Sequence, residues 1–381
     1  MFRFHHLYMR RRHFLRQAFW LGLAAPAFGI AEPDVFPWRA FVVDFIQSDG
    51  RVIDHGEQGR STSEGQAYAM FFALVANDRE RFRLLLEWIE RNLAGNDLRR
   101  NLPAWLWGKS LTGRWQVLDA NPASDADLWL SYVLLEAGRL WGEPAYSELG
   151  LAVLARVSRL SVAQLPGFGP MLLPAPQGFT FSGSKWRINP SYLVPQQLRR
   201  FAVADPTGPW SGLAASMPSM LRAVAPLGIV PDWAIYASGR WLPDAESNAT
   251  GSYDAVRAYL WTGMMSGADP LRAALLDAQR GLRAHMGIDG KLPERIDSRS
   301  GKAMGRAPVG FHAALLPWLS ALGDTNALAS ERSRVSAAGM DKPAVGTRTY
   351  YDRALALFGM GWLDGHFRFD PQGRLVTHWA S

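Results

Sequence analysis

Along most of this chain, apolar positions recur with the three-to-four-residue spacing of amphipathic helices, and short loops rich in Gly, Pro, Asn or Asp separate the segments. The spacing predicts about eleven helices. They are expected over residues 64–76, 79–93, 125–141, 145–160, 190–201, 210–225, 254–266, 271–285, 308–322, 326–338 and 350–363. Short strand-like pieces flank the turns at 238–239, 289–290 and 370–373, so some β structure is expected.

The short connections predict that consecutive helices pack as antiparallel pairs. A series of such pairs either closes into a toroid or extends as an open solenoid, and the absence of a fixed-length repeat favours closure. The 381 residues are enough for a large core, and no low-complexity linker divides them. We therefore expect a mainly α toroid of helical hairpins, folded as one domain over residues 32–381.

Residues 1–31 have a different pattern, which is typical of an export signal. The basic stretch at 10–12 precedes an apolar run at 19–28, and small residues offer cleavage after Ala27 or Ala31. The paired arginines resemble the twin-arginine export motif. We expect the mature protein in the bacterial periplasm or outside the cell, without stable membrane insertion. An amphipathic helix of a cytosolic protein, or an uncleaved anchor, is the alternative reading.

Composition excludes several classes of function. Removing residues 1–31, which hold five arginines and no acid, lowers the formal net charge from +7 to +2, so a nucleic-acid partner is not expected. The chain has no cysteine, and its eight histidines form no i, i+4 pair beside a carboxylate. We therefore expect no metal and no cofactor, and a monomeric protein.

The candidate chemistry lies in acids at predicted helix starts. Ser61 or Thr62 can cap one helix, which places Glu64 in or near its first turn, and the spacing from Ser61 to Glu64 also fits a purely structural capping box. The apolar run at 67–75 follows at once and could desolvate the carboxyl, which raises the pKa as a general acid requires.

Two further helix starts repeat this arrangement. Asp125 and Asp127 begin one helix, where one acid can face a site while Ser124 or the other acid caps the helix. Asp254 begins another helix, with Arg257 at i+3, a spacing that by itself indicates only a surface salt bridge. In a closed ring, the N-termini of alternate helices could bring these three acids together.

Aromatic residues accompany the acids. The chain has 16 Trp and 10 Tyr, most of which should belong to the core. Seven tryptophans fall in predicted loops, where they could stack on sugar rings: Trp105, Trp107, Trp115, Trp186, Trp210, Trp233 and Trp241. The segment from Trp186 to Tyr192 mixes an aromatic, a cation, an amide and a phenol without a phosphate-binding glycine loop, which favours a neutral polyhydroxylated ligand.

Taken together, these segments resemble the family 8 glycoside hydrolases, and among them the endoglucanases encoded with bacterial cellulose synthases. The quoted motifs are Ser63-Glu64-Gly65-Gln66-Ala67-Tyr68, Ala123-Ser124-Asp125-Ala126-Asp127 with Ala137 and Trp141, Asn189-Pro190-Ser191-Tyr192, Tyr253-Asp254-Ala255-Val256-Arg257, Tyr350-Tyr351 and Gly365-His366-Phe367. Leu130, Ser131 and Val133 depart from the family signature. The resemblance covers residue 37 to the end.

The resemblance implies an (α/α)6 barrel that hydrolyses β-1,4-glucan with inversion. It makes Glu64 the general acid and Asp254 the base, two carboxyls that inversion needs about 6.5–9.5 Å apart. It implies that Asp125 is a third catalytic acid, which holds the sugar or the water. The expected substrate-binding residues are Tyr253, Arg257, Tyr192, Trp107, Asn189, Trp186 and Tyr351. The expected partners are a glucan chain and the cellulose synthase export complex.

Other functions compete with this reading. The family also includes chitosanases, xylanases and mixed-linkage glucanases. A non-catalytic glucan-binding assembly protein would follow if each acid were only a helix cap. A toroidal lyase fits least, because three acids would repel its usual acidic sugars.

Overall fold

The computed structural model describes residues 37–287, 291–340 and 350–380. Residues 35–381 form one compact unit. The leader predicted over 1–31 and the turn predicted at 289–290 lie outside the described residues, so the division of the chain at residue 31 stays a prediction. None of the described helices combines the length and the apolar character needed to cross a membrane.

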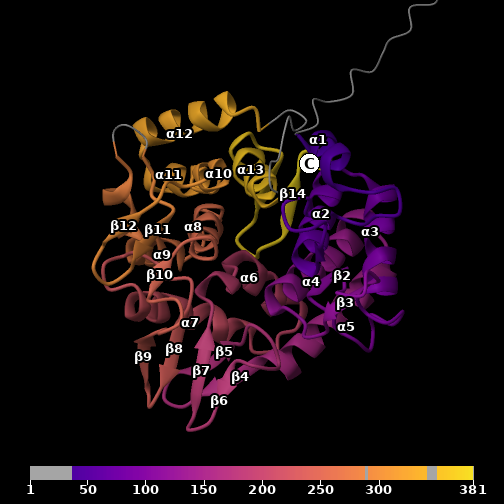
Figure 1. The fold of residues 1–381 in the computed structure, drawn as a ribbon, viewed down its shortest axis with the longest axis horizontal. Coiled ribbons are helices and arrows are strands. Elements are labelled where there is room, and N and C mark those ends of the chain that lie inside the picture. Colours follow the sequence, from indigo (N-terminus) through magenta and orange to yellow (C-terminus); the bar gives the residue numbers. More distant parts are fainter. Residues whose placement is uncertain (1–36, 288–290, 341–349, 381) are drawn as a thin grey trace, which may run out of the picture. The chain divides into compact units, whose positions relative to one another are not determined.

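Within the described residues, six helices form the inner wall of a closed ring (Figure 1). Each inner helix contacts the next one, and the last contacts the first. They are α2 (Ser63–Val75), α4 (Ser124–Trp141), α6 (Pro195–Ala204), α8 (Ala255–Gly263), α10 (Val309–Ala314) and α13 (Tyr350–Leu363).

An outer helix packs on each inner one, which confirms the predicted mainly α toroid of helical hairpins. The outer helices are α3 (Arg79–Asn92), α5 (Pro144–Ser161), α7 (Trp210–Val224), α9 (Arg272–Ala278), α12 (Thr325–Ala337) and α1 (Trp38–Phe45), the last of which the sequence pattern did not predict. A further short helix, α11 (Leu316–Leu322), continues α10 and contacts α8.

The inner helices carry apolar residues on all sides because they are surrounded by protein. In α2 every residue from Ala67 to Val75 is at most 1% exposed, whereas the outer helix α3 buries only one face, with Phe82, Leu85 and Ile89. At the centre, Phe71 stacks on Phe358 with ring centroids 5.3 Å apart. In the described part of the chain, aromatic side chains therefore fill the centre of the ring.

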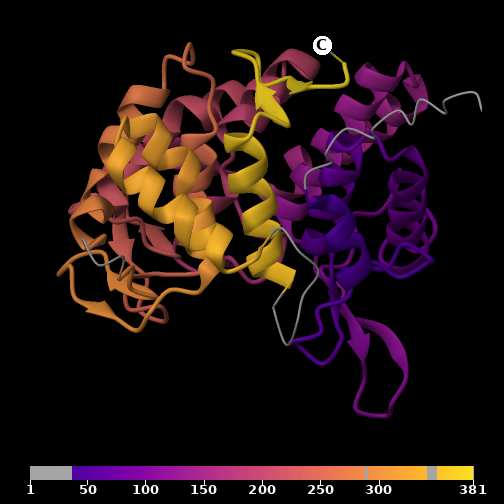
Figure 2. The same cartoon turned by 90° about the horizontal axis from the view of Figure 1, so that it is seen from above.

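Small antiparallel sheets make up the rest of the fold. β1 (Ser61–Thr62), β2 (Leu106–Lys109) and β3 (Trp115–Asp119) form one, and Figure 2 shows β2 and β3 projecting from the helices as a purple hairpin. A second sheet pairs β4 (Val162–Leu165) with β5 (Gly169–Leu172), and a third contains β6 (Thr180–Phe181), β7 (Lys185–Ile188), β8 (Ala234–Ala237) and β9 (Arg240–Pro243) in that order. A fourth contains β10 (Thr250–Gly251), β11 (Arg295–Asp297) and β12 (Ala303–Met304), and a fifth pairs β13 (Phe367–Phe369) with β14 (Leu375–Thr377).

The expected turns at 238–239 and 370–373 do connect paired strands. Three predicted helices are wrong as continuous elements. The segment 308–322 divides into α10 and α11, and Pro317 lies near the start of α11. Proline has no backbone N–H to donate, so it is disfavoured inside a continuous helix. Likewise, 190–201 divides before Pro195, and 271–285 ends as a 3₁₀ helix, Arg280–His285.

Candidate active site

The three acids singled out from the sequence lie at one end of the ring. Glu64 is in the first turn of α2, Asp125 is in the first turn of α4, and Asp254 immediately precedes α8. All three line one pocket of about 450 Å³, a volume typical of ligand sites. The N-terminal ends of α2, α4 and α8 therefore meet at this pocket, although they lie far apart in the sequence.

Glu64 does not serve as a cap. Thr62 caps α2, its hydroxyl accepting the Gly65 amide at 3.1 Å, so the capping-box interpretation is wrong. The Glu64 carboxylate instead accepts a hydrogen bond from the Tyr350 hydroxyl at 2.7 Å and another from Arg257. Its position inside the pocket therefore owes nothing to helix capping.

The capping interpretation of the second acid pair is also wrong. α4 begins at Ser124, the preceding residue Ala123 offers no capping side chain, and the Ser124 hydroxyl donates to the Leu173 carbonyl at 2.6 Å. One Asp125 oxygen accepts the adjacent Ala126 amide at 2.8 Å, and the other lies 3.4 Å from Arg257. Asp127 is fully buried, and among the described residues neither of its carboxyl oxygens has a hydrogen-bond partner.

Arg257 joins the acids. Its guanidinium donates to the Asp254 carboxylate at 2.7 Å and to the Ser191 hydroxyl at 3.2 Å, while its other terminal nitrogen contacts Glu64. The Arg257 side chain is only 3% exposed, and Asp254, at 30%, opens into the pocket, so the surface salt-bridge interpretation is wrong. A buried charge of this kind persists only where it is paired, as it is here on both sides.

Burial shifts the pKa values of the site. It raises the pKa of Asp125 to about 7, an effect that Arg257 opposes and the Glu64 charge reinforces. Burial also raises the pKa of Asp254, again against the attraction of Arg257. Burial and then the Glu64 charge raise the pKa of the Tyr350 phenol well above its ordinary value, so it stays a neutral donor.

The other predicted site residues divide into two groups. Tyr192, Tyr253, Arg257 and Tyr351 line the same pocket as the acids. Trp107, Trp186 and Asn189 do not line it. Their proposed binding of substrate stays a prediction.

Trp107 lies on β2 and stacks on Trp115 at 5.1 Å, and the Arg51 guanidinium lies against both rings. Trp186 lies on β7 and packs near Tyr236. Asn189 is buried, and its side-chain oxygen accepts the Ser191 hydroxyl at 2.7 Å, so it holds a residue that touches Arg257.

The loop placement of several tryptophans is corrected by the structure. Trp107, Trp115, Trp186 and Trp241 lie on strands, while Trp105 and Trp233 lie outside helices and strands. Trp210 starts α7 with no exposed surface, and its indole donates to Asp205 at 3.0 Å.

Sequence reasoning missed four contributors. Tyr350 reaches Glu64, Tyr68 lies 3.4 Å from Arg257, and Ser191 also contacts that guanidinium. Asp232 was not singled out at all, although its carboxyl accepts amides on both sides of Asp254. Tyr350 belongs to the quoted Tyr350-Tyr351 pair, and Tyr68 and Ser191 belong to two other quoted motifs, so the sequence held a signal for these three. Nothing near Asp232 resembles a helix start.

The part of the chain that the structure describes holds no group of three His, Asp or Glu side chains arranged to bind a metal ion. The arrangement can instead transfer protons. It holds a carboxyl with a phenol donor, a second carboxyl across a guanidinium, and a third whose pKa lies near neutrality.

Comparison with known proteins gives concordant results. The family model described as Glycosyl hydrolases family 8 matches residues 13–365. A protein named endoglucanase from Xanthomonas axonopodis pv. citri is 47% identical over 98% of each chain. Another of that name from Escherichia coli K12 is 42% identical over 94% of this chain and 95% of its own. The crystal structure of endo-1,4-D-glucanase from Vibrio fischeri ES114 superposes with a TM-score of 0.85 at 37% identity, covering 91% of this chain and 99% of that one.

Proposed function

The chain belongs to family 8 of the glycosyl hydrolases, and from this membership we propose that it cuts β-1,4-glucan chains internally, with inversion at the anomeric carbon. The observation that carries the proposal is the meeting of Glu64 and Asp254 on one buried guanidinium inside a pocket. Relatives named endoglucanase, similar over nearly their whole length, favour glucan as the polymer.

In the proposed reaction Glu64 is the acid and Asp254 the base. Protonated Glu64 gives its proton to the glycosidic oxygen as the bond to the anomeric carbon breaks. A water molecule forms the new bond from the opposite face, and its proton passes to Asp254. Atoms and charge balance, since the base ends protonated and the acid ionised. Proton exchange with solvent then resets the pair.

Arg257 and Tyr350 fit this scheme. The Tyr350 hydroxyl donates to one Glu64 oxygen and Arg257 donates to the other, so the two donors fix the orientation of the carboxyl in the pocket. Arg257 lies between the Glu64 and Asp254 carboxylates and keeps them out of direct contact. An inverting pair of carboxyls needs such a separation, because a water molecule must fit between them and the sugar. Asp125, on the same guanidinium, is placed to hold the sugar or the water.

The first test is Glu64→Gln. Loss of the acid should lower kcat on carboxymethylcellulose by roughly 10²–10⁴-fold, while the unfolding midpoint stays near wild type. Glu148→Gln is the matched control, because Glu148 is an exposed glutamate paired only with Arg99 in the described contacts. Activity retained in Glu64→Gln would overturn the assignment of the acid.

The substrate and the stereochemistry are tested on the wild type. We expect faster release of reducing ends from β-1,4-glucan than from chitosan, xylan or mixed-linkage glucan. NMR of a cello-oligosaccharide digest should show the α-anomer first. A β-anomer appearing first would reject inversion, and a preference for another polymer would reassign the substrate.

We further infer that residues 1–31 direct export and that the enzyme acts beside a bacterial cellulose synthase. The support is the basic–apolar–small order of the leader and the resemblance to endoglucanases encoded with such synthases. Cell fractionation after replacing Arg11 and Arg12 by lysine tests the route. In a cellulose-producing strain lacking its own endoglucanase, the wild type should restore normal polymer and Glu64→Gln should not.

A further inference from the structure

The first turns of the acid-bearing helices share a geometric problem. An amide at the start of a helix lacks an intrahelical acceptor, and the nearest carboxylate tends to fold back onto it. In α4 this happens, because Asp125 itself accepts the Ala126 amide at 2.8 Å. In α2 it does not, because Thr62 accepts the Gly65 amide and leaves Glu64 free for the pocket.

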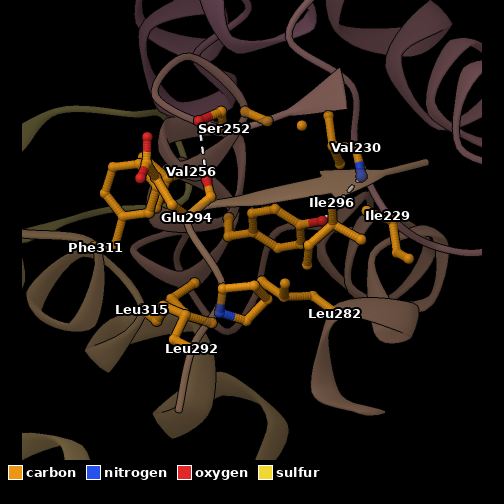
Figure 3. Close-up of a pocket in the computed structure, with 14 residues that line it drawn as sticks. Ile229, Val230, Ser252, Val256, Leu282, Leu292, Glu294, Ile296, Phe311 and Leu315 are labelled. Carbon is orange, nitrogen blue, oxygen red and sulfur yellow. Dashed lines mark hydrogen bonds between the residues drawn. The ribbon is translucent and has the colours of Figure 1, made fainter. Parts of the chain in front are cut away.

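In α8 the equivalent amide belongs to Ala255, the residue after the proposed base. Helical bonding already begins at Ser252, whose carbonyl accepts the Val256 amide at 3.1 Å. The Ser252 hydroxyl could cap Ala255 but donates instead to the Glu294 carbonyl at 2.9 Å (Figure 3). Asp254 makes no capping bond either, and its carboxylate faces Arg257.

The cap comes from a distant segment. One Asp232 carboxyl oxygen accepts the Ser252 amide and the Ala255 amide, each at 2.8 Å, so the two bonds bracket Asp254. The Asp232 amide in turn donates to the Thr250 carbonyl at 2.8 Å. The segment before β8 is thereby fastened to the turn that carries the base.

The surroundings of the turn make this cap hard to replace. Behind it lies an apolar pocket lined by Val230, Val256, Leu292 and Ile296 (Figure 3). Close to the same pocket, the Val230 amide donates to the Tyr259 hydroxyl at 2.9 Å, so that phenol is already engaged. Without Asp232, the carboxylate best placed to accept the Ala255 amide is that of Asp254 itself.

We propose that Asp232 is a positioning residue that caps the α8 turn from outside the helix and so keeps the Asp254 carboxylate directed at the reacting water. The inference rests on the proposed role of Asp254 as the base. It requires an acceptor oxygen and not a charge, because either form of the carboxyl can accept the two amides. Burial, and then the Asp254 charge, raise the pKa of Asp232 to about 7, so the neutral form is accessible.

The test compares Asp232→Ala with Asp232→Asn. Alanine removes the acceptor, and the base should turn toward the Ala255 amide, lowering kcat roughly 100-fold while KM changes less than about two-fold. Asparagine keeps an acceptor oxygen and should restore kcat to within several-fold of wild type. A crystal structure of Asp232→Ala should show an Asp254 oxygen on the Ala255 amide.

Asp324→Ala is the matched control for a merely structural loss. Asp324 caps α12 by accepting the Ala327 amide at 3.0 Å, so its removal should cost stability without lowering kcat. The inference is overturned if Asp232→Ala retains kcat, if asparagine fails to rescue, or if KM changes in place of kcat. Asp254→Asn is assayed in parallel, since activity in that variant would reject the proposed base itself, independently of Asp232.

Discussion

At the scale of single residues, the site depends on partners that are close in space and distant in sequence. The spacing of Asp254 and Arg257 at i, i+3 predicted their pairing, which the structure shows at 2.7 Å. No local pattern could predict that the same guanidinium reaches Glu64, which is 193 residues from Arg257. Nor could it predict that Tyr350, which is 286 residues from Glu64, donates a hydrogen bond to the Glu64 carboxylate. The acids could therefore be proposed from helix starts, but their hydrogen bonds could not.

If Asp254 is the base, as proposed, Arg257 should set the acid limb of the pH profile. Its positive charge favours the ionised base and so lowers the pKa of Asp254 against the effect of burial. In Arg257→Gln that pKa should rise, and because the base must be ionised, the acid limb of kcat/KM should move to higher pH. Arg257→Lys keeps a cation and should leave the limb nearly in place while lowering the rate. An unmoved limb in Arg257→Gln would contradict this account.

At the scale of elements, long helices with strong periodicity were predicted well and short paired strands were not. The segment 350–363 matches α13 at both ends, and 79–93 matches α3 to within one residue. The pairing of β7 with β8 joins residues as far apart as Lys185 and Ala237, and each strand is only four residues long. Such strands are specified by their partners, which a local pattern does not contain.

The β2–β3 hairpin gives a prediction at this scale. Trp107 stacks on Trp115 at 5.1 Å, meets Trp88 edge-on at 5.5 Å and lies under Arg51 at 4.3 Å, so it anchors the hairpin to the body. Trp107→Ala should lower the free energy of unfolding by about 1–3 kcal/mol, below the range for a fully buried Trp. Leu111→Ala, at the fully exposed tip, should change it by less than about 0.5 kcal/mol. Equal urea midpoints for the two variants would disprove the anchoring role.

At the scale of the whole molecule, closure of the ring was predictable, but the polar contacts that hold the C-terminal strands on the ring were not. The lack of a fixed repeat favoured a toroid, and each inner helix does contact the next. After α13, the segment that contains β13 and β14 contacts helices from much earlier in the sequence. The Tyr132 hydroxyl donates to the Gly373 carbonyl at 2.8 Å, and the Trp379 indole donates to the Val75 carbonyl at 3.0 Å.

Glu136 accepts hydrogen bonds from several of the groups that hold the C-terminal strands on the ring. It has no exposed surface, and it accepts Arg200 from α6 at 2.6 Å, Arg139 from its own helix and the Leu375 amide of β14 at 2.8 Å. Glu136→Ala would leave the Arg200 charge and the Leu375 amide without their acceptor, so the free energy of unfolding should fall by about 3–5 kcal/mol.

Urea unfolding measures this loss, with Glu87→Ala as the control. Glu87 forms an exposed i, i+4 pair with Arg83, and its removal should cost less than about 1 kcal/mol. Because the ion pair joins helices away from the three acids, kcat of folded Glu136→Ala at low temperature should stay near wild type. A loss no larger than that of Glu87→Ala would mean that packing alone, without the buried carboxylate, holds the C-terminal strands on the ring.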